Sequence, residues 1–332
     1  MKTAIIGLGV IGNVHANILA GHNVDIVALC DINTASAENT KERLNLKCNI
    51  YSDFKKMLSC EKIDVVHICC PHYLHAEMII YFLSKDVNVL SEKPLCISLD
   101  ELNAIIKAEI ASKAILGVCH QNRYNATSIF AKEFIKDKKV LGGYANVVWH
   151  RDEKYYKKDS WRGKWKTEGG GVLINQALHT LDLLQWFAGM PESLSAVTGT
   201  TTLNNTIEVE DSAVINCYGD KPFSFFATVG AFYTYPVEIN LMLEDKNLLK
   251  ITNAYVNLNG KEIFCSADKD KYFGKSCYGV GHEGLFEDFY KCVNARKKFS
   301  IDGAEAGKVI KLILASYKSN GEKIRIEEDY GN

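Results

Sequence analysis

The N-terminal segment Gly7-Leu8-Gly9-Val10-Ile11-Gly12 constrains the fold of this chain more than any other feature. Its G-x-G-x-x-G spacing follows an apolar run, Thr3–Ile6, and precedes a segment of helical period. In such a unit the first glycine permits a tight turn, the second lets a pyrophosphate approach the backbone, and the third lets the helix contact the strand closely. Asp31 stands nineteen residues after Gly12, where a carboxylate can bind an adenosine ribose and repel a 2′-phosphate. The sequence therefore predicts a dinucleotide site that favours NAD over NADP.

Up to about residue 120, short runs rich in valine and isoleucine alternate with segments of helical period. The runs are Thr3–Ile6, Val24–Cys30, Val65–Cys69, Val87–Ser91 and Ile115–Val118. This alternation is typical of βαβ units around a parallel sheet. Ser98-Leu99-Asp100-Glu101 has the pattern of a capping box, in which the serine and the glutamate each satisfy a backbone N–H, and it predicts the start of a helix.

Beyond residue 121 the runs become aromatic and β-branched, which predicts antiparallel strands. These runs are Tyr144–Trp149, Ala213–Tyr218, Phe223–Gly230 and Val237–Leu243. One helix is expected from Val172 to Ala188, and two more, Glu283–Ala295 and Ala304–Ser319, near the end. We therefore expect an α/β protein, with a dinucleotide-binding domain over 1–121 and an α+β domain over 122–332 whose large open sheet is mostly antiparallel.

The composition limits the classes of binding partner that we expect. With 332 residues and 47% hydrophobic content, the chain is long enough for two globular domains. A net charge of -1 without a dense basic cluster favours neither nucleic acid nor a membrane surface, and no apolar run reaches membrane-spanning length. The eleven cysteines form no C-x-x-C, so we expect reduced thiols in a cytoplasmic protein. Histidines and cysteines lack zinc-ligand spacing, so no metal site is expected.

Two loops follow expected strands at the edge where parallel sheets bind ligands. Glu92-Lys93-Pro94 closes the run Val87–Ser91, and Lys93 there can meet a hydroxyl beside a nicotinamide ring. Pro71-His72-Tyr73-Leu74-His75 follows the run before it, on the nicotinamide side. For His75, a residue that hydrogen-bonds the backbone at a helix start is an equally good interpretation.

A third candidate segment lies in the second domain. Gly169-Gly170-Gly171 precedes the expected helix that carries Asn175, His179 and Asp182. Their spacing of i, i+4 and i+7 places the three side chains on one helical face. The alternative is a core histidine satisfied by amide and carboxylate partners.

Tyr51 and Lys55 form a Y-x-x-x-K pattern, which serves as the acid–base pair of another dehydrogenase class. We discount it, because the pair follows a short third strand, too early in the chain for a completed nucleotide fold to present a catalytic tyrosine.

The ordered series of motifs closely resembles the Gfo/Idh/MocA oxidoreductases over nearly the whole chain. The matching segments are Gly7–Gly12, Pro71–His75, Glu92–Pro94, Gln121–Asn125, Trp161–Gly163, Glu168–Asp182, Ile207–Asp211 and Gly281-His282. The resemblance implies a Rossmann domain followed by a domain whose open sheet commonly joins subunits, here as a homodimer or homotetramer.

The resemblance also implies roles for individual residues. Lys93 is the expected acid–base group, with a pKa lowered by partial burial and the positive nicotinamide, and His179 its partner. The expected NAD contacts are Gly7, Gly9, Val10, Ile11, Gly12, Asp31, Pro71, His72, His75, Glu92, Lys93 and Gln121. The expected holders of substrate oxygens are Arg123, Tyr156, Arg162, Asn175, His179 and His282. For Tyr156 and Arg162, a structural role at the domain interface is an equal alternative.

Asn175 departs from the inositol dehydrogenases, which have an aspartate at this position. The Asn175-Gln176 pair resembles members that act on nucleotide sugars or pyranosides. We expect an NAD-dependent dehydrogenase that reversibly oxidises a secondary ring hydroxyl of a sugar, glycoside or nucleotide sugar, at C3. Two alternatives remain open: an NAD-dependent glycosidase that oxidises, eliminates and re-reduces, and a non-catalytic NAD-binding sugar sensor.

Overall fold

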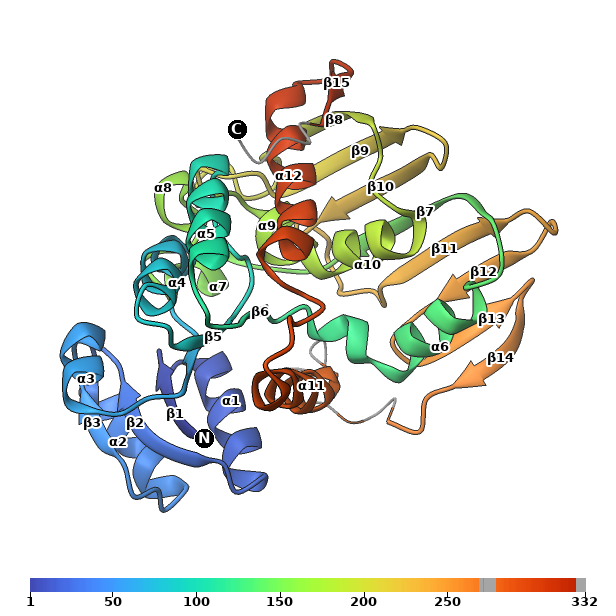
Figure 1. Cartoon of the computed structure of the whole chain (residues 1–332). Helices are drawn as coiled ribbons and strands as arrows, with labels where there is room; N and C mark the ends of the chain where they lie inside the picture. Colours follow the sequence, from blue (N-terminus) through green and yellow to red (C-terminus); the bar gives the residue numbers. More distant parts are fainter. Residues whose placement is uncertain (269–270, 272–278, 327–332) are drawn as a thin grey trace.

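The computed structural model describes residues 1–268, 271 and 279–326, and it contains two sheets (Figure 1). The first has six parallel strands in the order β3-β2-β1-β4-β5-β6. They are β1 (Lys2–Ile6), β2 (Asp25–Cys30), β3 (Asn49–Tyr51), β4 (Val65–Ile68), β5 (Asn88–Ser91) and β6 (Leu116–Val118). The five apolar runs all form strands, and the predicted parallel sheet is confirmed. Because the strand order reverses between β1 and β4, a ligand crevice is expected beyond the carboxyl ends of these two strands.

The helices of this half connect successive strands. They are α1 (Val10–Gly21), α2 (Thr34–Arg43), α3 (Phe54–Cys60), η1 (His72–Leu74), α4 (His75–Leu83) and α5 (Leu99–Ala111). The predicted capping of α5 is present in part. Ser98 Oγ accepts the Glu101 N–H at 3.2 Å, but the Glu101 carboxylate accepts the N–H of Ile97, at 2.9 Å. This cap fixes the segment that follows Lys93.

The second sheet has nine strands in the order β14-β13-β12-β11-β7-β10-β9-β8-β15. They are β7 (Val140–Val148), β8 (Ser193–Gly199), β9 (Ser212–Tyr218), β10 (Phe223–Thr228), β11 (Glu238–Leu243), β12 (Leu248–Ile251), β13 (Tyr255–Leu258), β14 (Lys261–Cys265) and β15 (Ile324–Arg325). Every neighbouring pair is antiparallel except β7 and β10. The expectation of a large, mostly antiparallel sheet is therefore confirmed, although β8, β12, β13, β14 and β15 were not foreseen.

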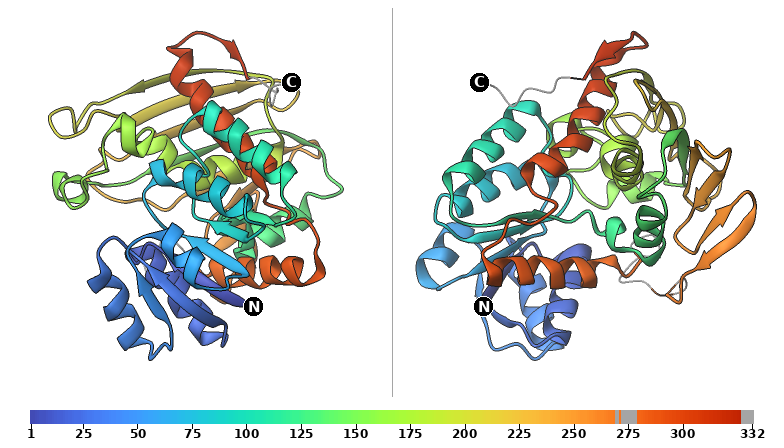
Figure 2. Two further views of the ribbon diagram at one scale, coloured as in Figure 1. Left: turned by 60° about the vertical axis from the view of Figure 1, so that its left-hand side comes forward. Right: turned by 45° about the vertical axis from the view of Figure 1, so that its right-hand side comes forward.

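Helices cover one face of this sheet, and two of them return to the first domain (Figure 2). The helices of this half are η2 (Gln121–Tyr124), α6 (Ala126–Phe134), α7 (Glu153–Lys157), α8 (Trp165–Glu168), α9 (Val172–Asn175), α10 (Leu178–Ala188), α11 (Gly281–Ala295) and α12 (Gly303–Ser319). Helix α12 contacts both α5 and β8, and Tyr290 of α11 hydrogen-bonds Thr3 of β1. The boundary after residue 121 stays a prediction, because these C-terminal helices contact both sheets.

The expected continuous helix from Val172 to Ala188 is wrong, because it breaks between Asn175 and Leu178. The N–H groups of Gln176 and Ala177 both point to the carbonyl of Val172. The carbonyl of Asn175 accepts the Lys93 ammonium at 2.9 Å. A side chain of the first domain thus donates to a backbone carbonyl at the break. The helical period of the sequence gives no sign of this contact.

Within the described ranges, none of the helices is both long and apolar enough to cross a membrane.

A buried ion pair connects three helices of the second domain. The Arg123 guanidinium donates to both carboxylate oxygens of Asp182, at 2.7 and 2.6 Å, and to Glu305 at 2.9 Å. Burial raises the pKa of Asp182, but the charge of Arg123 outweighs this and lowers it from 3.8 to about 2. The pair therefore joins η2, α10 and α12 in their native arrangement.

We predict that Arg123→Met lowers the free energy of unfolding by about 3–5 kcal/mol, because Asp182 loses its buried partner. Since the folded pKa of Asp182 is depressed, the wild type should lose this stabilisation as the pH falls from about 4 towards 2. Urea unfolding at several pH values measures both effects. The control is Lys157→Met, which removes an exposed partner of Glu153 and should cost less than about 0.5 kcal/mol. Equal losses in the two variants would contradict the prediction.

Candidate active site

The glycine turn after β1 has the shape of a phosphate cradle. Gly7 has a φ of 85°, and a Cβ there would lie 2.6 Å from the Cys69 carbonyl oxygen. A Cβ on Gly12 would lie 1.8 Å from the carbonyl oxygen of Gly7, whereas a Cβ on Gly9 would meet no atom of the described residues within 4 Å. The middle glycine thus borders open space at the N-terminus of α1, where backbone N–H groups attract phosphate.

Asp31 completes this cradle at the end of β2. Its carboxylate accepts the N–H of Leu8, inside the glycine turn, at 2.6 Å and the N–H of Asn33 at 2.8 Å. These bonds fix the carboxylate beside the turn, as the binding of an adenosine ribose requires. Val10 is half exposed in the first turn of α1, and Ile11 lies beside it. The residues present therefore fit a dinucleotide.

The histidines of the loop after β4 hydrogen-bond to backbone carbonyls of the protein. Pro71 precedes η1, and His72 lies buried with its Nδ1 2.8 Å from the Glu168 carbonyl oxygen. His75 is buried between the carbonyl oxygens of Pro94 and Cys70, at 2.6 and 2.8 Å. Of its two interpretations, the structure supports backbone bonding at the start of α4. The expected NAD contacts of these histidines stay predictions, since both side chains hydrogen-bond to backbone carbonyls.

Lys93 reaches from the end of β5 to the second domain. Its backbone N–H donates to its neighbour Glu92 at 3.1 Å, and its ammonium donates to the Asn175 carbonyl at 2.9 Å. The side chain is half-buried. The amine consequently lies where the carboxyl end of the parallel sheet meets the break between α9 and α10.

His179 is the second residue of α10, directly after that break. Its Nε2 is 3.2 Å from the amide nitrogen of Gln121, and its Nδ1 is buried without a hydrogen-bond partner among the described residues. Burial, followed by the charge of Lys93, lowers the pKa of His179 well below its usual range. The ring is therefore neutral at neutral pH, and because Nε2 faces the donor amide nitrogen of Gln121, the ring proton lies on Nδ1.

Asn175 has a different partner from the one expected. Its amide nitrogen donates to the buried carboxylate of Glu168, which also accepts the N–H of Gly163. Burial raises the pKa of Glu168, and these donors oppose the rise. Asn175 thus stabilises a buried carboxylate with its side chain and anchors Lys93 with its carbonyl. Its expected contact with a substrate oxygen stays a prediction.

Two of the expected substrate residues face protein instead. Arg123 is engaged by Asp182 and Glu305, as described above. His282 is fully buried, with its Nε2 3.3 Å from the Glu92 carboxylate. Neither side chain is available to a substrate in this structure, so the expected roles of Arg123 and His282 are corrected: both are bound to buried carboxylates.

Of the two interpretations of Tyr156, the structure supports the structural one. Tyr156 is 4% exposed and belongs to the core. Tyr155 instead accepts the Arg162 guanidinium at 2.8 Å and the Gln176 amide at 3.3 Å. Arg162 also binds Asp159, at 2.8 Å. Two adjacent tyrosines on a short helix are equivalent in sequence, so only the direction in which α7 faces distinguishes them.

The structure supports discounting the Y-x-x-x-K pattern. The Tyr51 hydroxyl donates to Glu61 at 2.7 Å, while Lys55 pairs with Glu77 at 3.1 Å. The two side chains have separate partners around the edge strand β3.

Two family models match successive parts of the chain. "Oxidoreductase family, NAD-binding Rossmann fold" matches residues 1–120, and "GFO/IDH/MocA C-terminal domain" matches residues 131–244. The chain belongs to the Gfo/Idh/MocA family. Its first domain is therefore an NAD-binding Rossmann domain, and NAD is the cofactor.

Relatives of this Gfo/Idh/MocA protein include several dehydrogenases. The WlbA dehydrogenase of Bordetella pertussis, solved with NADH and UDP-GlcNAcA, is 26% identical with a TM-score of 0.85, and 99% of each chain is covered. Inositol 2-dehydrogenase of Rubrobacter xylanophilus is 25% identical over 190 residues, which span 56% of this chain and only 52% of the relative. A 2,7-anhydro-N-acetylneuraminate hydratase of Mediterraneibacter gnavus is 26% identical over 76% of this chain and 68% of its own length.

We predict that Gly9→Ala and Gly12→Ala separate cofactor binding from folding. Gly9→Ala should leave the melting temperature nearly unchanged but weaken NADH binding by roughly tenfold or more, because its methyl group occupies the pyrophosphate approach. Gly12→Ala should lower the melting temperature, because its methyl group would overlap the backbone of Gly7. NADH titration and thermal unfolding measure the two effects. Similar affinity and stability in the two variants would refute this assignment.

We also predict a pH-dependent cost for Asn175→Asp. The new carboxylate would face Glu168, and the two buried groups would have to share a proton. A folded-state pKa raised in this way removes stability as the pH rises above about 4.3, so the loss should be larger at pH 8 than at pH 5 by roughly 1 kcal/mol or more.

The matched control is Asn49→Asp. The Asn49 amide donates to the exposed carboxylate of Glu61 at 2.7 Å, so the same change occurs in solvent. Its cost should stay within about 0.5 kcal/mol at both pH values. A pH-independent loss for Asn175→Asp would show that Glu168 is not ionised beside it.

Proposed function

We propose that this chain is an NAD-dependent dehydrogenase that reversibly oxidises a secondary ring hydroxyl, at C3, of a sugar, glycoside or nucleotide sugar. The observation that carries the proposal is the convergence of Lys93 and His179 at the break between α9 and α10. Lys93 binds the carbonyl of Asn175, and His179 follows four residues later with a ring nitrogen available.

Oxidation of an alcohol removes a hydride from carbon and a proton from oxygen. Bound NAD accepts the hydride. The chain must hold the hydroxyl and take its proton, and Lys93 and His179 are the groups suited to this role. The lowered pKa of His179 keeps its ring neutral, so it can donate a hydrogen bond from Nδ1 to the substrate oxygen and take up a proton at Nε2.

The relatives support the class of substrate. The WlbA dehydrogenase, whose match covers nearly both chains, was solved with a nucleotide sugar. The match to inositol 2-dehydrogenase spans about half of that protein, and Asn175 departs from the aspartate expected of it. These findings favour a sugar or nucleotide sugar over a free inositol.

A redox-neutral reaction is the second candidate, favoured by the hydratase relative. Hydration involves no net oxidation, so a related enzyme would oxidise and re-reduce its substrate while NAD stays bound, as an NAD-dependent glycosidase would. A sensor without catalysis is disfavoured, because a binding protein has no need to direct both Lys93 and His179 into one site.

We further propose that the outer face of the large sheet binds a second copy of this chain in a homodimer or homotetramer. Strands β9 and β10 alternate between buried residues under the helices and exposed residues on the other face. The exposed large hydrophobic residues on this sheet include Leu141, Tyr144, Val197, Val214, Tyr218, Phe226, Met242 and Leu248. A reducing cytoplasm is the proposed compartment, since every cysteine among the described residues is a free thiol.

The decisive experiment is an assay of purified protein with NAD against glycosides, inositols and nucleotide sugars, following both NADH and product. We expect NADH formation with at least one sugar. Lys93→Ala should lower turnover by roughly a hundredfold or more, with a much smaller effect on NADH binding. The control is Lys55→Ala, in the coincidental Y-x-x-x-K pattern, which should retain turnover.

The outcomes separate the candidates. Conversion of substrate without NADH release would support the redox-neutral reaction. A Lys93→Ala variant with most of its turnover would show that another group moves the proton.

A further inference from the structure

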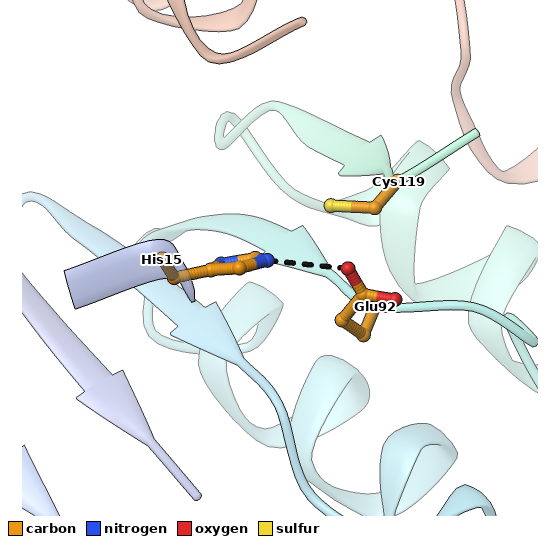
Figure 3. Close-up of side chains that lie close together, drawn as sticks. All are labelled: His15, Glu92 and Cys119. Atoms are coloured by element: carbon orange, nitrogen blue, oxygen red, sulfur yellow. Dashed lines mark hydrogen bonds and ion pairs between the residues drawn. The ribbon is translucent and has the colours of Figure 1, made fainter. Parts of the chain in front are cut away.

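A cluster of buried side chains with metal-binding chemistry lies beneath the carboxyl end of the parallel sheet. His15 comes from α1, Glu92 from the end of β5 and Cys119 from the residue after β6, and Figure 3 shows the three pointing toward one another. Their imidazole nitrogen, carboxylate oxygen and sulfur atoms all lie within 4.8 Å of one another. His282 of α11 adds a second imidazole nitrogen, 3.3 Å from the same Glu92 oxygen.

The spacing of these atoms matches the edges of a zinc tetrahedron. Zinc bonds of about 2.0–2.2 Å to nitrogen and oxygen give tetrahedral edges of about 3.3–3.6 Å. The Glu92 oxygen lies 3.2 Å from the His15 nitrogen and 3.3 Å from the His282 nitrogen. Two edges are therefore already formed, and the Cys119 sulfur, which lies within 4.8 Å of the His15 and Glu92 atoms, has to move closer to complete the set.

The charges of this set also favour a divalent ion. The four side chains are buried, with Glu92 4% exposed and His15, Cys119 and His282 at 0%. One carboxylate, one thiolate and two neutral imidazoles carry a charge of −2, which a divalent cation would cancel. Soft thiolate and imidazole donors select zinc over magnesium or calcium.

Outer contacts orient His15 as a ligand. Its Nδ1 lies 2.9 Å from Nδ1 of His67. The Nε2 of His67 lies 3.0 Å from the Tyr290 hydroxyl, which in turn lies 3.0 Å from Thr3 Oγ1. If every hydrogen in this chain points away from His15, its Nε2 lone pair faces the cluster. Metal-binding histidines typically hold their second nitrogen in this way.

We propose that His15, Glu92, Cys119 and His282 bind one zinc ion. Binding would displace the thiol proton of Cys119 and release it to solvent while the sulfur bonds to the metal. All four positions are filled by protein, so the ion would be structural and would connect α1, β5, β6 and α11. The sequence pattern gives no sign of this site, because its ligands come from four distant segments.

Metal analysis and cobalt substitution test the proposal in the full-length chain. To remove signals from exposed thiols, Cys60 and Cys265 are replaced by serine in every sample. After zinc reconstitution and dialysis, we expect about one zinc per chain and a higher melting temperature than in the chelator-treated protein. Cobalt(II) in place of zinc should give a thiolate-to-cobalt charge-transfer band and the visible bands of a tetrahedral ion.

Cys119→Ser should abolish the charge-transfer band and weaken zinc binding by about a hundredfold or more, because losing a ligand exceeds the effect of losing an outer contact. Cys217→Ser, which alters another buried thiol in β9, should keep both. If Cys119→Ser fails to fold, the zinc content and the cobalt spectrum of the protein with the intact cluster still test the proposal. Less than about 0.1 zinc per chain, or bound cobalt without a thiolate band, would overturn the proposal and leave Glu92 as a hydrogen-bonded carboxylate.

Discussion

The contact on which this architecture depends is the hydrogen bond from the Lys93 ammonium to the Asn175 carbonyl. It joins the end of a strand in the NAD-binding domain to the break between α9 and α10. A carbonyl at a helix end lacks its intrahelical partner, so an ammonium satisfies it at little cost. The same contact fixes the amine close to His179. The acid–base pair of the proposed reaction therefore exists only when the two domains are docked.

Buried polar contacts within the second domain in turn hold its helices in place. Asp182 and Arg123 are both almost inaccessible to solvent, and the buried carboxylate of Glu168 accepts the partly exposed Asn175 amide. A buried carboxylate is costly without donors, so each pair penalises any displacement of one element from the other. These buried charged groups therefore stabilise the arrangement of the helices. For this reason, a polar residue near a cleft is a poor guide to substrate contacts.

The position of a polar residue in the sequence predicted which part of the fold it lies in. It was a poorer guide to the group with which its side chain forms a hydrogen bond. Arg123 and His282 were expected to hold substrate oxygens, yet their side chains bind Asp182 and Glu92. Tyr156 was chosen where Tyr155 makes the polar contacts. In each case the local pattern allows several directions, and the choice is made by elements distant in sequence. His75 shows the same effect, since only the fold places Pro94 and Cys70 on both sides of its ring.

The sequence by itself determined the parallel sheet, the glycine cradle with Asp31, and the location of Lys93 after β5. These follow from short-range rules: apolar period, turn stereochemistry and the fixed order of a βαβ unit. Only the tertiary structure decided the break after Asn175, the partners of the buried charges, and the meeting of His15, Glu92, Cys119 and His282. Those features depend on contacts between segments up to hundreds of residues apart, where a low-dielectric interior selects the pairs that leave no charge unmatched.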